Sequence, residues 1–338
     1  MTTPLVTCLQ PIRAGILFLS ALALMACSAV ANSNSYKASI TPENFTGSQH
    51  MNIHLQGSLA ISSAQVDNLP VVELSDLAWD VDAKKLYAVS DNGYLYTIKL
   101  TMHNNQIKQA KVIKAVRLKG ENKKPLRGRM GDAEGLAIKN SQNNNPNDAE
   151  LIISFERNSR VDRYNTSGDY LGNIPLPKHL LNHRNFRHRN KMLESVTLHP
   201  KHGALVAAEL PVKKNASNLQ SIYSQHGKVW HFPRLKAAKS AITALEVLNN
   251  GDILVLERAY SGIFNPLVIS LRQVKLDRCN QQNHCAVQDL AIFDSAKGWS
   301  IDNFEGLTHL QGNQYLMVSD DNKNPLQRTL MVKFEILP

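Results

Sequence analysis

Acidic residues recur at a regular spacing along this chain, and they are the residues whose types and positions could do chemistry. In three copies, a short apolar run separates a first acid from a second acid that lies 15 positions later: Asp76 and Asp91, Glu194 and Glu209, and Glu305 and Asp320. A fourth copy, Glu134 to Glu156, is longer because it carries the polar insert 140–148. A fifth copy ends in Glu257 but has Ile242 where the first acid is expected.

The spacing places both acids of a copy at one end of a sheet, because adjacent antiparallel strands begin and end side by side. If the copies surround one axis, they form a ring at one channel mouth: Asp76, Asp91, Glu134, Glu156, Glu194, Glu209, Glu257, Glu305 and Asp320. Like charges this close raise one another's pKa or require cations. Oxygen ligands suit Ca²⁺ or Mg²⁺, and no His or Cys cluster indicates zinc. The alternative is that about half of these acids bond strand-end N–H groups and pair with Arg129, Arg157 and Arg258.

Within this ring we predict separate roles for the acids. The expected catalytic acids are Glu134, Glu194 and Glu305. The expected metal ligands, with calcium as the suspected ion, are Asp91, Glu156, Glu209 and Asp320. No nucleophile motif accompanies them, so catalysis would use a metal-activated water.

Two basic loops run directly into the acids. Residues 119–129 precede Glu134, and residues 179–191 precede Glu194. Cations overhanging a metal site would bind a phosphorylated or otherwise anionic small-molecule ester, so the expected anion-binding residues are Arg129, Lys191, Arg157 and Arg258. The alternative is that these loops are simply solvated or contact an anionic membrane surface.

The elements that must position these residues are short strands. The copies begin near 75, 133, 193, 241 and 304, and this long period of short strands predicts an array such as a propeller. In the first copy, strands are expected at 76–79, 85–90, 94–100 and 111–118, with a hairpin turn at 91–93. Four antiparallel strands make a propeller blade.

The predicted fold is therefore all-β, a single propeller-like ring of four-stranded antiparallel blades. Five blades can be identified, and a sixth could lie in 36–74 or 210–240. The last copy has only three strands, so a strand within 54–61 is expected to complete it and close the ring. The alternative is an irregular two-sheet β protein.

Composition narrows the partners. Of the 338 residues, 43% are hydrophobic, which is enough for a sizeable core, and the net charge of +10 favours anionic partners. No recognition helix, zinc finger or stacking motif accompanies the charge, so specific nucleic-acid binding is not expected. A monomer is expected.

The N-terminus resembles an export signal, because Arg13 precedes an apolar run at 15–26 that is too short to span a bilayer. The expected segments are a signal peptide at 1–31, an N-terminal segment with the ring-closing strand at 32–70 and the propeller at 71–338. Cleavage after Ala31 would release a protein into the bacterial periplasm. Alternatively, a lipobox ending at Cys27 would give a lipid anchor and association with the outer membrane.

Cysteine usage agrees with export. Cys279 and Cys285 flank a polar turn between two strand-like runs, which predicts a local disulfide in an oxidising compartment. A metal site would need more soft ligands than His284 alone.

Four segments also resemble a known family: 132–137, 190–196, 254–260 and 303–307. They are similar to motifs of the bacterial phytase-like proteins called the esterase-like activity of phytase family, over about 74–334. The resemblance implies an exported β-propeller that hydrolyses phosphate or carboxylic esters, with calcium by analogy to propeller phytases. The chain departs from the pattern at Ser195, where glycine is usual, and at Ile242, where an acid is usual.

Two hypotheses follow from these patterns. The first is a calcium-dependent periplasmic hydrolase of phosphate or carboxylic esters. The second is a non-catalytic propeller that binds an envelope ligand or protein partner, with its acids only ordering the blades.

Overall fold

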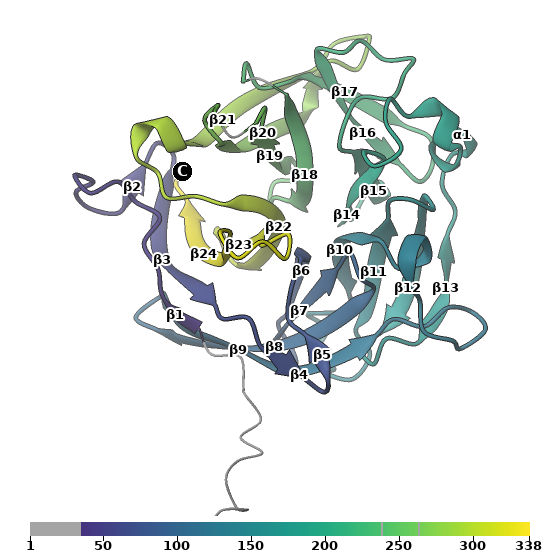
Figure 1. Cartoon of the computed structure of the whole chain (residues 1–338). Coiled ribbons are helices and arrows are strands. Elements are labelled where there is room, and N and C mark those ends of the chain that lie inside the picture. The colour runs from purple at the N-terminus through teal and green to yellow at the C-terminus, as the bar shows by residue number, and fades with distance from the viewer. Residues whose placement is uncertain (1–34, 238, 263) are drawn as a thin grey trace, which may run out of the picture. The chain divides into compact units, whose positions relative to one another are not determined.

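The computed structural model describes residues 35–237, 239–262 and 264–338, and their strands form sheets arranged around a common centre (Figure 1). Blade 1 comprises β6 (Leu74–Asp80), β7 (Lys85–Ser90), β8 (Tyr94–His103) and β9 (Gln106–Arg117). Blade 2 comprises β10 (Ala133–Lys139), β11 (Glu150–Phe155), β12 (Arg160–Asn165) and β13 (Tyr170–Ile174). Blade 3 comprises β14 (Leu193–His199), β15 (Gly203–Ala208), β16 (Leu219–Ser224) and β17 (Val229–Pro233).

Blade 4 comprises β18 (Ser240–Val247), β19 (Ile253–Ala259), β20 (Val268–Cys279) and β21 (Cys285–Asp294). Blade 5 comprises β22 (Asn303–Gln311), β23 (Gln314–Asp320), β24 (Thr329–Ile336) and β3 (Ile53–Ile61). Every pairing within the blades is antiparallel, and the first strand of each blade lies nearest the centre (Figure 1). The all-β fold and the propeller architecture predicted from the repeats are confirmed.

The fifth blade joins the two ends of the described chain. β3 pairs with β24 from Ile53 opposite Ile336 to Ile61 opposite Thr329, in the segment where a ring-closing strand was expected. The short strands β1 (Ser35–Lys37) and β2 (Gln49–His50) pair with β3. Since β3 covers the edge of β24 that does not pair with β23, that edge of the blade is not left open.

Among the described residues there are five blades and no sixth. Residues 210–240 contain β16 and β17 of blade 3, and 36–74 contain β3 and the two-residue strands β4 (Gln65–Val66) and β5 (Leu69–Pro70). Helices are brief: α1 (Lys178–Leu181), η1 (Gly128–Met130), η2 (His183–Asn185) and η3 (Ser295–Lys297). None of the helices in the described ranges is long and apolar enough to cross a membrane.

The hydrophobic core lies between the blades. There are five clusters of buried apolar residues, and each joins two consecutive blades around the ring. For example, Ile242 and Val255 of blade 4 share a cluster with Leu205 and Trp230 of blade 3. One blade cannot bury its own faces, so the stability of each blade depends on its two neighbours.

A β-bulge interrupts the innermost strand of every blade near its start. In each, one residue is skipped in the pairing with the second strand: Ser75, Glu134, Glu194, Thr243 and Glu305. A bulge re-aims the side chain of the extra residue. This register corrects the repeat alignment made from sequence, because the counterpart of Glu134 is Ser75 in blade 1 and Thr243 in blade 4, not Asp76 and Ile242.

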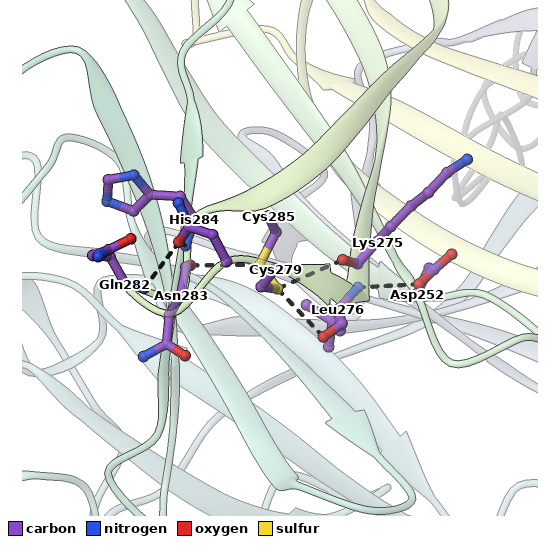
Figure 2. The surroundings of a disulfide bond; sticks show 9 residues. Asp252, Lys275, Leu276, Cys279, Gln282, Asn283, His284 and Cys285 are labelled. Atoms are coloured by element: carbon purple, nitrogen blue, oxygen red, sulfur yellow. Dashed lines mark hydrogen bonds between the residues drawn. A yellow bond between two sulfur atoms is a disulfide. The ribbon is translucent and has the colours of Figure 1, made fainter.

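The predicted disulfide is present between Cys279 and Cys285, at the end of the β20–β21 hairpin (Figure 2). Figure 2 shows Leu276 beside it, whose N–H donates to Asp252 Oδ1 at 3.1 Å. The bridge therefore closes a hairpin at the periphery of blade 4 and has a structural role. The predicted signal peptide and Cys27 lie outside the described residues.

Candidate functional site

Three positions of each blade meet at one end of the ring. They are the bulge residue, the residue two positions before it and the residue near the end of the second strand that lies opposite the latter. In blade 2 these are Glu134, Asp132 and Glu156, and the N–H of Glu156 donates to the backbone oxygen of Asp132 at 3.0 Å. In blade 3 the N–H of Glu209 makes the same bond to Met192.

We call the charged residues at these positions the mouth cluster: Glu73, Asp91, Asp132, Glu134, Glu156, Glu194, Glu209, Arg258, Glu305 and Asp320. Seven of the nine predicted acids belong to it. Asp132 was not predicted as a site residue. Its signal in the sequence is its position two residues before Glu134, which Asn303 repeats before Glu305.

Two overlapping groups of carboxylates in the mouth cluster could hold a metal ion. One consists of Asp132, Glu134 and Glu156, and the other of Glu156, Glu194 and Glu209. In each group, one oxygen per residue lies within 4.8 Å of the others. Glu156 belongs to both groups and therefore lies at the centre of the candidate site.

Glu134 and Glu194 have no compensating partner. Among the residues that the structure describes, none makes a hydrogen bond or ion pair with either carboxylate. Burial, with repulsion from Glu305 and other nearby acids, raises the pKa of Glu134 well above its ordinary value. Burial and repulsion from Glu209 and Glu134 do the same to the pKa of Glu194. Burial also raises the pKa of Glu156 to about 8, although its bond from the Met192 N–H opposes the shift.

Blade 4 contributes a cation instead of an acid. Arg258 occupies the position of the second acid, and its guanidinium donates to Glu305 Oε1 at 2.6 Å and Glu209 Oε1 at 3.1 Å. Burial alone would lower the pKa of Arg258, but Glu305 and Glu209 outweigh it and raise that pKa. Asn303 donates to Glu305 at 2.8 Å and also bonds Arg258. The carboxylate of Glu305 is thus neutralised within the protein.

Glu257 does not belong to the mouth cluster, which corrects the prediction of nine ringed acids. It lies one residue before Arg258 and therefore on the opposite face of β19. Its carboxylate is fully buried and pairs with Arg272 at 2.8 Å. Glu257 is a structural acid inside blade 4.

Asp76 is the second acid that the prediction misplaced. Its carboxylate accepts backbone N–H groups from Leu77 at 2.8 Å, Leu136 at 2.7 Å and Leu307 at 2.8 Å. These donors lie on the innermost strands of blades 1, 2 and 5. Asp76 fits here because the neighbouring Gly306 has no side chain. A Cβ at Gly306 would approach the Asp76 Cα to 2.7 Å. Asp76 ties three blades together and is not available as a ligand.

Asp91 and Asp320 lie on the other side of the mouth cluster. Asp91 interacts with Glu73, and burial with this repulsion raises the pKa of Asp91 to about 7. Burial and repulsion from Glu305 raise the pKa of Asp320 to about 8. Lys323 pairs with Glu73, which supplies a positive charge on this side.

The predicted anion-binding residues divide into two sets. Lys191 pairs with Glu209 at 2.5 Å, and Arg258 lies within the acids, so both neutralise the mouth cluster. Arg129 and Arg157 line a separate cavity of about 110 Å³ together with His183, Arg189, Asn190 and Met192. His183 and Arg189 were not predicted individually, although both belong to the basic loop noted in the sequence.

This cavity, which we call the cationic pocket, shares a wall with the carboxylates. Arg157 pairs with Asp132 at 3.2 Å, and Met192 donates its N–H to Glu156 at 3.0 Å. Arg129 and Arg189 have no acidic partner among the described residues. Two cations without an acidic partner thus lie next to carboxylates that could hold a metal ion, an arrangement that suits a ligand with an anionic group.

A family model described as "Phytase-like: Esterase-like activity of phytase" matches residues 69–323, which is most of the chain. The chain belongs to this phytase-like family. A comparison with curated proteins finds no match. Similar solved structures include the PQQ-bound form of aldose sugar dehydrogenase from Streptomyces coelicolor, at 8% identity and a TM-score of 0.41. That alignment covers 82% of this chain and 98% of the dehydrogenase, and a similarity this low carries no functional argument.

In this phytase-like propeller, the mouth cluster should make stability depend on pH. The pKa values of Glu156 and Asp320, about 8, lie above those of an unfolded chain, so the folded protein holds protons that the unfolded chain has lost. Stability is therefore present at low pH and lost as the pH rises towards the folded pKa values. We expect the free energy of unfolding in chelator to fall by a few kcal/mol between about pH 6.5 and about pH 8.5.

Urea unfolding with fluorescence detection, at a series of pH values, measures this slope. Added calcium should flatten it, because a bound cation replaces the protons. Glu156→Gln should also flatten it, whereas Asp169→Asn, at a partly exposed acid that pairs with Lys119 away from the mouth cluster, should not. A free energy of unfolding in chelator that is constant across this range would contradict the prediction.

Proposed function

We propose that this phytase-like chain hydrolyses an anionic ester, with a phosphate ester preferred, at the mouth cluster and with the help of a bound divalent cation. One observation carries the proposal: the unpaired Glu134 and Glu194 belong to carboxylate groups that Asp132 and Glu156 connect to the cationic pocket, where Arg129 and Arg189 have no acidic partner among the described residues. Family membership supports a propeller enzyme of the hydrolase kind. The cation, the substrate and the direction of attack are the parts that we add.

The residues present fit a Ca²⁺ ion. Asp132, Glu134 and Glu156 offer carboxylate oxygens from two chain segments, and calcium accepts such irregular oxygen sets. The lack of partners for Glu134 leaves a buried charge that a cation would neutralise. When bound, the ion would polarise the ester and stabilise the negative charge that develops in the transition state.

The cationic pocket would hold the anionic group of the substrate. Arg129, Arg157 and Arg189 present planar guanidinium groups that suit phosphate oxygens. Arg157 also contacts Asp132, so an anion in the pocket would be fixed next to the carboxylates that hold the cation. The pocket thereby orients the ester for attack.

Glu194 is the residue we assign to proton transfer. It is unpaired, it lies in the group that shares Glu156, and burial with repulsion from Glu209 raises its pKa above the ordinary value, which makes its carboxylate a stronger base. A water attacks the ester phosphorus, Glu194 accepts its proton, and the bond from phosphorus to the leaving oxygen breaks. The leaving alcohol then takes up that proton. Glu305 cannot serve equally, because Arg258 and Asn303 hold its carboxylate.

The proposal places this activity outside the cytoplasm. The disulfide of Cys279 and Cys285 supports an oxidising compartment. The bacterial periplasm, with or without a lipid at Cys27, remains our proposed location, and a monomer that does not recognise specific nucleic acids remains our proposed state.

Hydrolysis assays test the proposed function directly. With calcium, we expect turnover of phytate and p-nitrophenyl phosphate that is lost in chelator. Glu194→Gln should lower kcat by about 100-fold or more, the range of general-base catalysis. Arg189→Gln should raise KM for phosphate esters and leave KM for p-nitrophenyl acetate unchanged.

Two exposed charged residues provide matched controls. Glu121→Gln is the control for Glu194→Gln, and Arg184→Gln is the control for Arg189→Gln, because neither residue lines the cationic pocket. No turnover of any ester by the calcium-loaded protein would reject the hydrolase. If calcium still stabilised that inactive protein, the result would favour the non-catalytic propeller that binds an envelope ligand.

A further inference from the structure

Large apolar side chains stand exposed on the side of the ring that carries the mouth cluster. Phe264 is 95% exposed and Leu326 is 90% exposed. The loop with Phe264 leaves blade 4 just after Arg258, and the loop with Leu326 leaves blade 5 just after Asp320. Both loops therefore rise from positions of the mouth cluster in adjacent blades. Half-exposed Tyr260 begins the first of them.

Beside blade 4, the loop that leads into blade 3 and the loop between β15 and β16 of that blade form a surface without acids. We call it the basic platform, and its exposed cations are Lys178, Arg184, Arg189, Lys213 and Lys214. No acidic residue occurs in 175–192 or in 210–218. Among the described residues, none of these five cations has an acidic partner. The absence of counter-charges makes the potential over the basic platform positive.

Backbone contacts, not charge pairs, hold the basic platform in shape. Arg187 lies between its two loops and donates to the backbone oxygens of Pro211 at 2.9 Å and Asn215 at 2.6 Å. The N–H of Lys213 donates to the Asn185 oxygen at 2.8 Å. The platform is thus preorganised with its like charges side by side, which costs free energy unless an anionic surface compensates them.

We propose that the mouth side of the ring docks on an anionic lipid surface. The basic platform would contact the anionic headgroups, and Phe264 and Leu326 would enter the boundary between headgroups and acyl chains. Cations together with exposed aromatic and aliphatic side chains are the features by which peripheral proteins bind such surfaces. The inference goes beyond the proposed hydrolysis and does not depend on it.

Other occupants fit these features less well. A soluble polyanion would neutralise the basic platform but leave Phe264 and Leu326 in water. A protein partner would be expected to cover one contiguous apolar patch, whereas here the exposed apolar side chains stand on two separate loops, of blades 4 and 5, and the platform lies on the neighbouring blade 3. A flat anionic layer contacts both at once.

Vesicle co-sedimentation tests the proposal. The chain from Asn32 is used, because it forms one compact unit and lacks the apolar segment 15–26, which could itself bind lipid. We expect binding to vesicles that contain phosphatidylglycerol and not to vesicles of phosphatidylcholine alone, and the binding should weaken with salt. Lys213→Gln with Lys214→Gln should weaken it by about tenfold or more, and Phe264→Ser with Leu326→Ser should weaken it at least as clearly.

Matched controls lie on the outer strand β9, where Ile113→Ser and Lys114→Gln change exposed residues of the same kinds and should leave binding unchanged. The variants alter exposed side chains, and thermal unfolding checks that each is folded. Failure to bind the anionic vesicles, or equal binding by all variants, would overturn the proposal. The proposal would also be overturned if Phe264→Ser changed neither binding to heparin nor binding to the vesicles. That result would indicate a surface for soluble polyanions.

Discussion

Replacing Asp76 by alanine is expected to lower the free energy of unfolding by about 4 kcal/mol or more. The carboxylate accepts three backbone N–H groups from three blades, and no side chain at this position other than a short acceptor can reach them. Without it, buried donors at the centre of the ring lose their partner, and each unsatisfied donor costs about 1–3 kcal/mol. Urea unfolding followed by circular dichroism measures the change.

Two variants separate this role from a general loss of charge. Asp76→Asn keeps one acceptor oxygen and should lose less stability than Asp76→Ala. Asp82→Ala also removes a carboxylate that accepts a backbone N–H, from Asn143 at 2.7 Å, but at an exposed site. It should cost no more than about 1 kcal/mol. An Asp76→Ala protein as stable as Asp82→Ala would show that the three bonds do not hold the ring together.

Replacing Arg258 by methionine is the second change with a large expected effect. It leaves Glu209 and Glu305 without the buried cation that pairs with both. Breaking such a buried pair by removing one partner costs about 3–5 kcal/mol. We therefore expect a loss of that order in chelator. Calcium should restore more stability to this variant than it adds to the wild type, because the freed carboxylates offer oxygens to a further cation.

Isothermal titration with calcium counts the ions, and Arg258→Met is expected to bind one more than the wild type. Arg258→Lys keeps the charge and should bind the wild-type number. Arg258→Met combined with Glu305→Gln removes one charge of each sign and should also return towards the wild-type number. An unchanged calcium count in Arg258→Met would show that Arg258 does not occupy a place that a metal could take.

Some acids of the mouth cluster have cationic partners and others have none, because blade 4 differs from the other blades. Thr243 stands where blades 2, 3 and 5 have acids, and Arg258 stands where the other four blades have acids. Internal neutralisation therefore reaches Glu209 and Glu305 but not Glu134 and Glu194. The sequence pattern already indicated that this blade was the exception. It placed the exception at Ile242, one residue from Thr243, and it assigned the second acid to Glu257 in place of Arg258.

The sequence by itself determined the architecture and the end of the ring where the site lies. The recurring strands, the hairpin at 91–93 and the acids at strand ends predicted a propeller with nine acids at one mouth, and seven of them lie there. These features are local, since strand periodicity and turn residues act over a few positions.

Only the tertiary structure decided which acids are free. A shift of one residue in a strand turns a side chain to the opposite face, and the bulges introduce such shifts without any signal in the spacing. Asp76 and Glu257 are thereby withdrawn from the mouth, and Arg258 enters it. The cationic pocket likewise combines loops far apart in the chain, whose approach depends on how whole blades pack against one another.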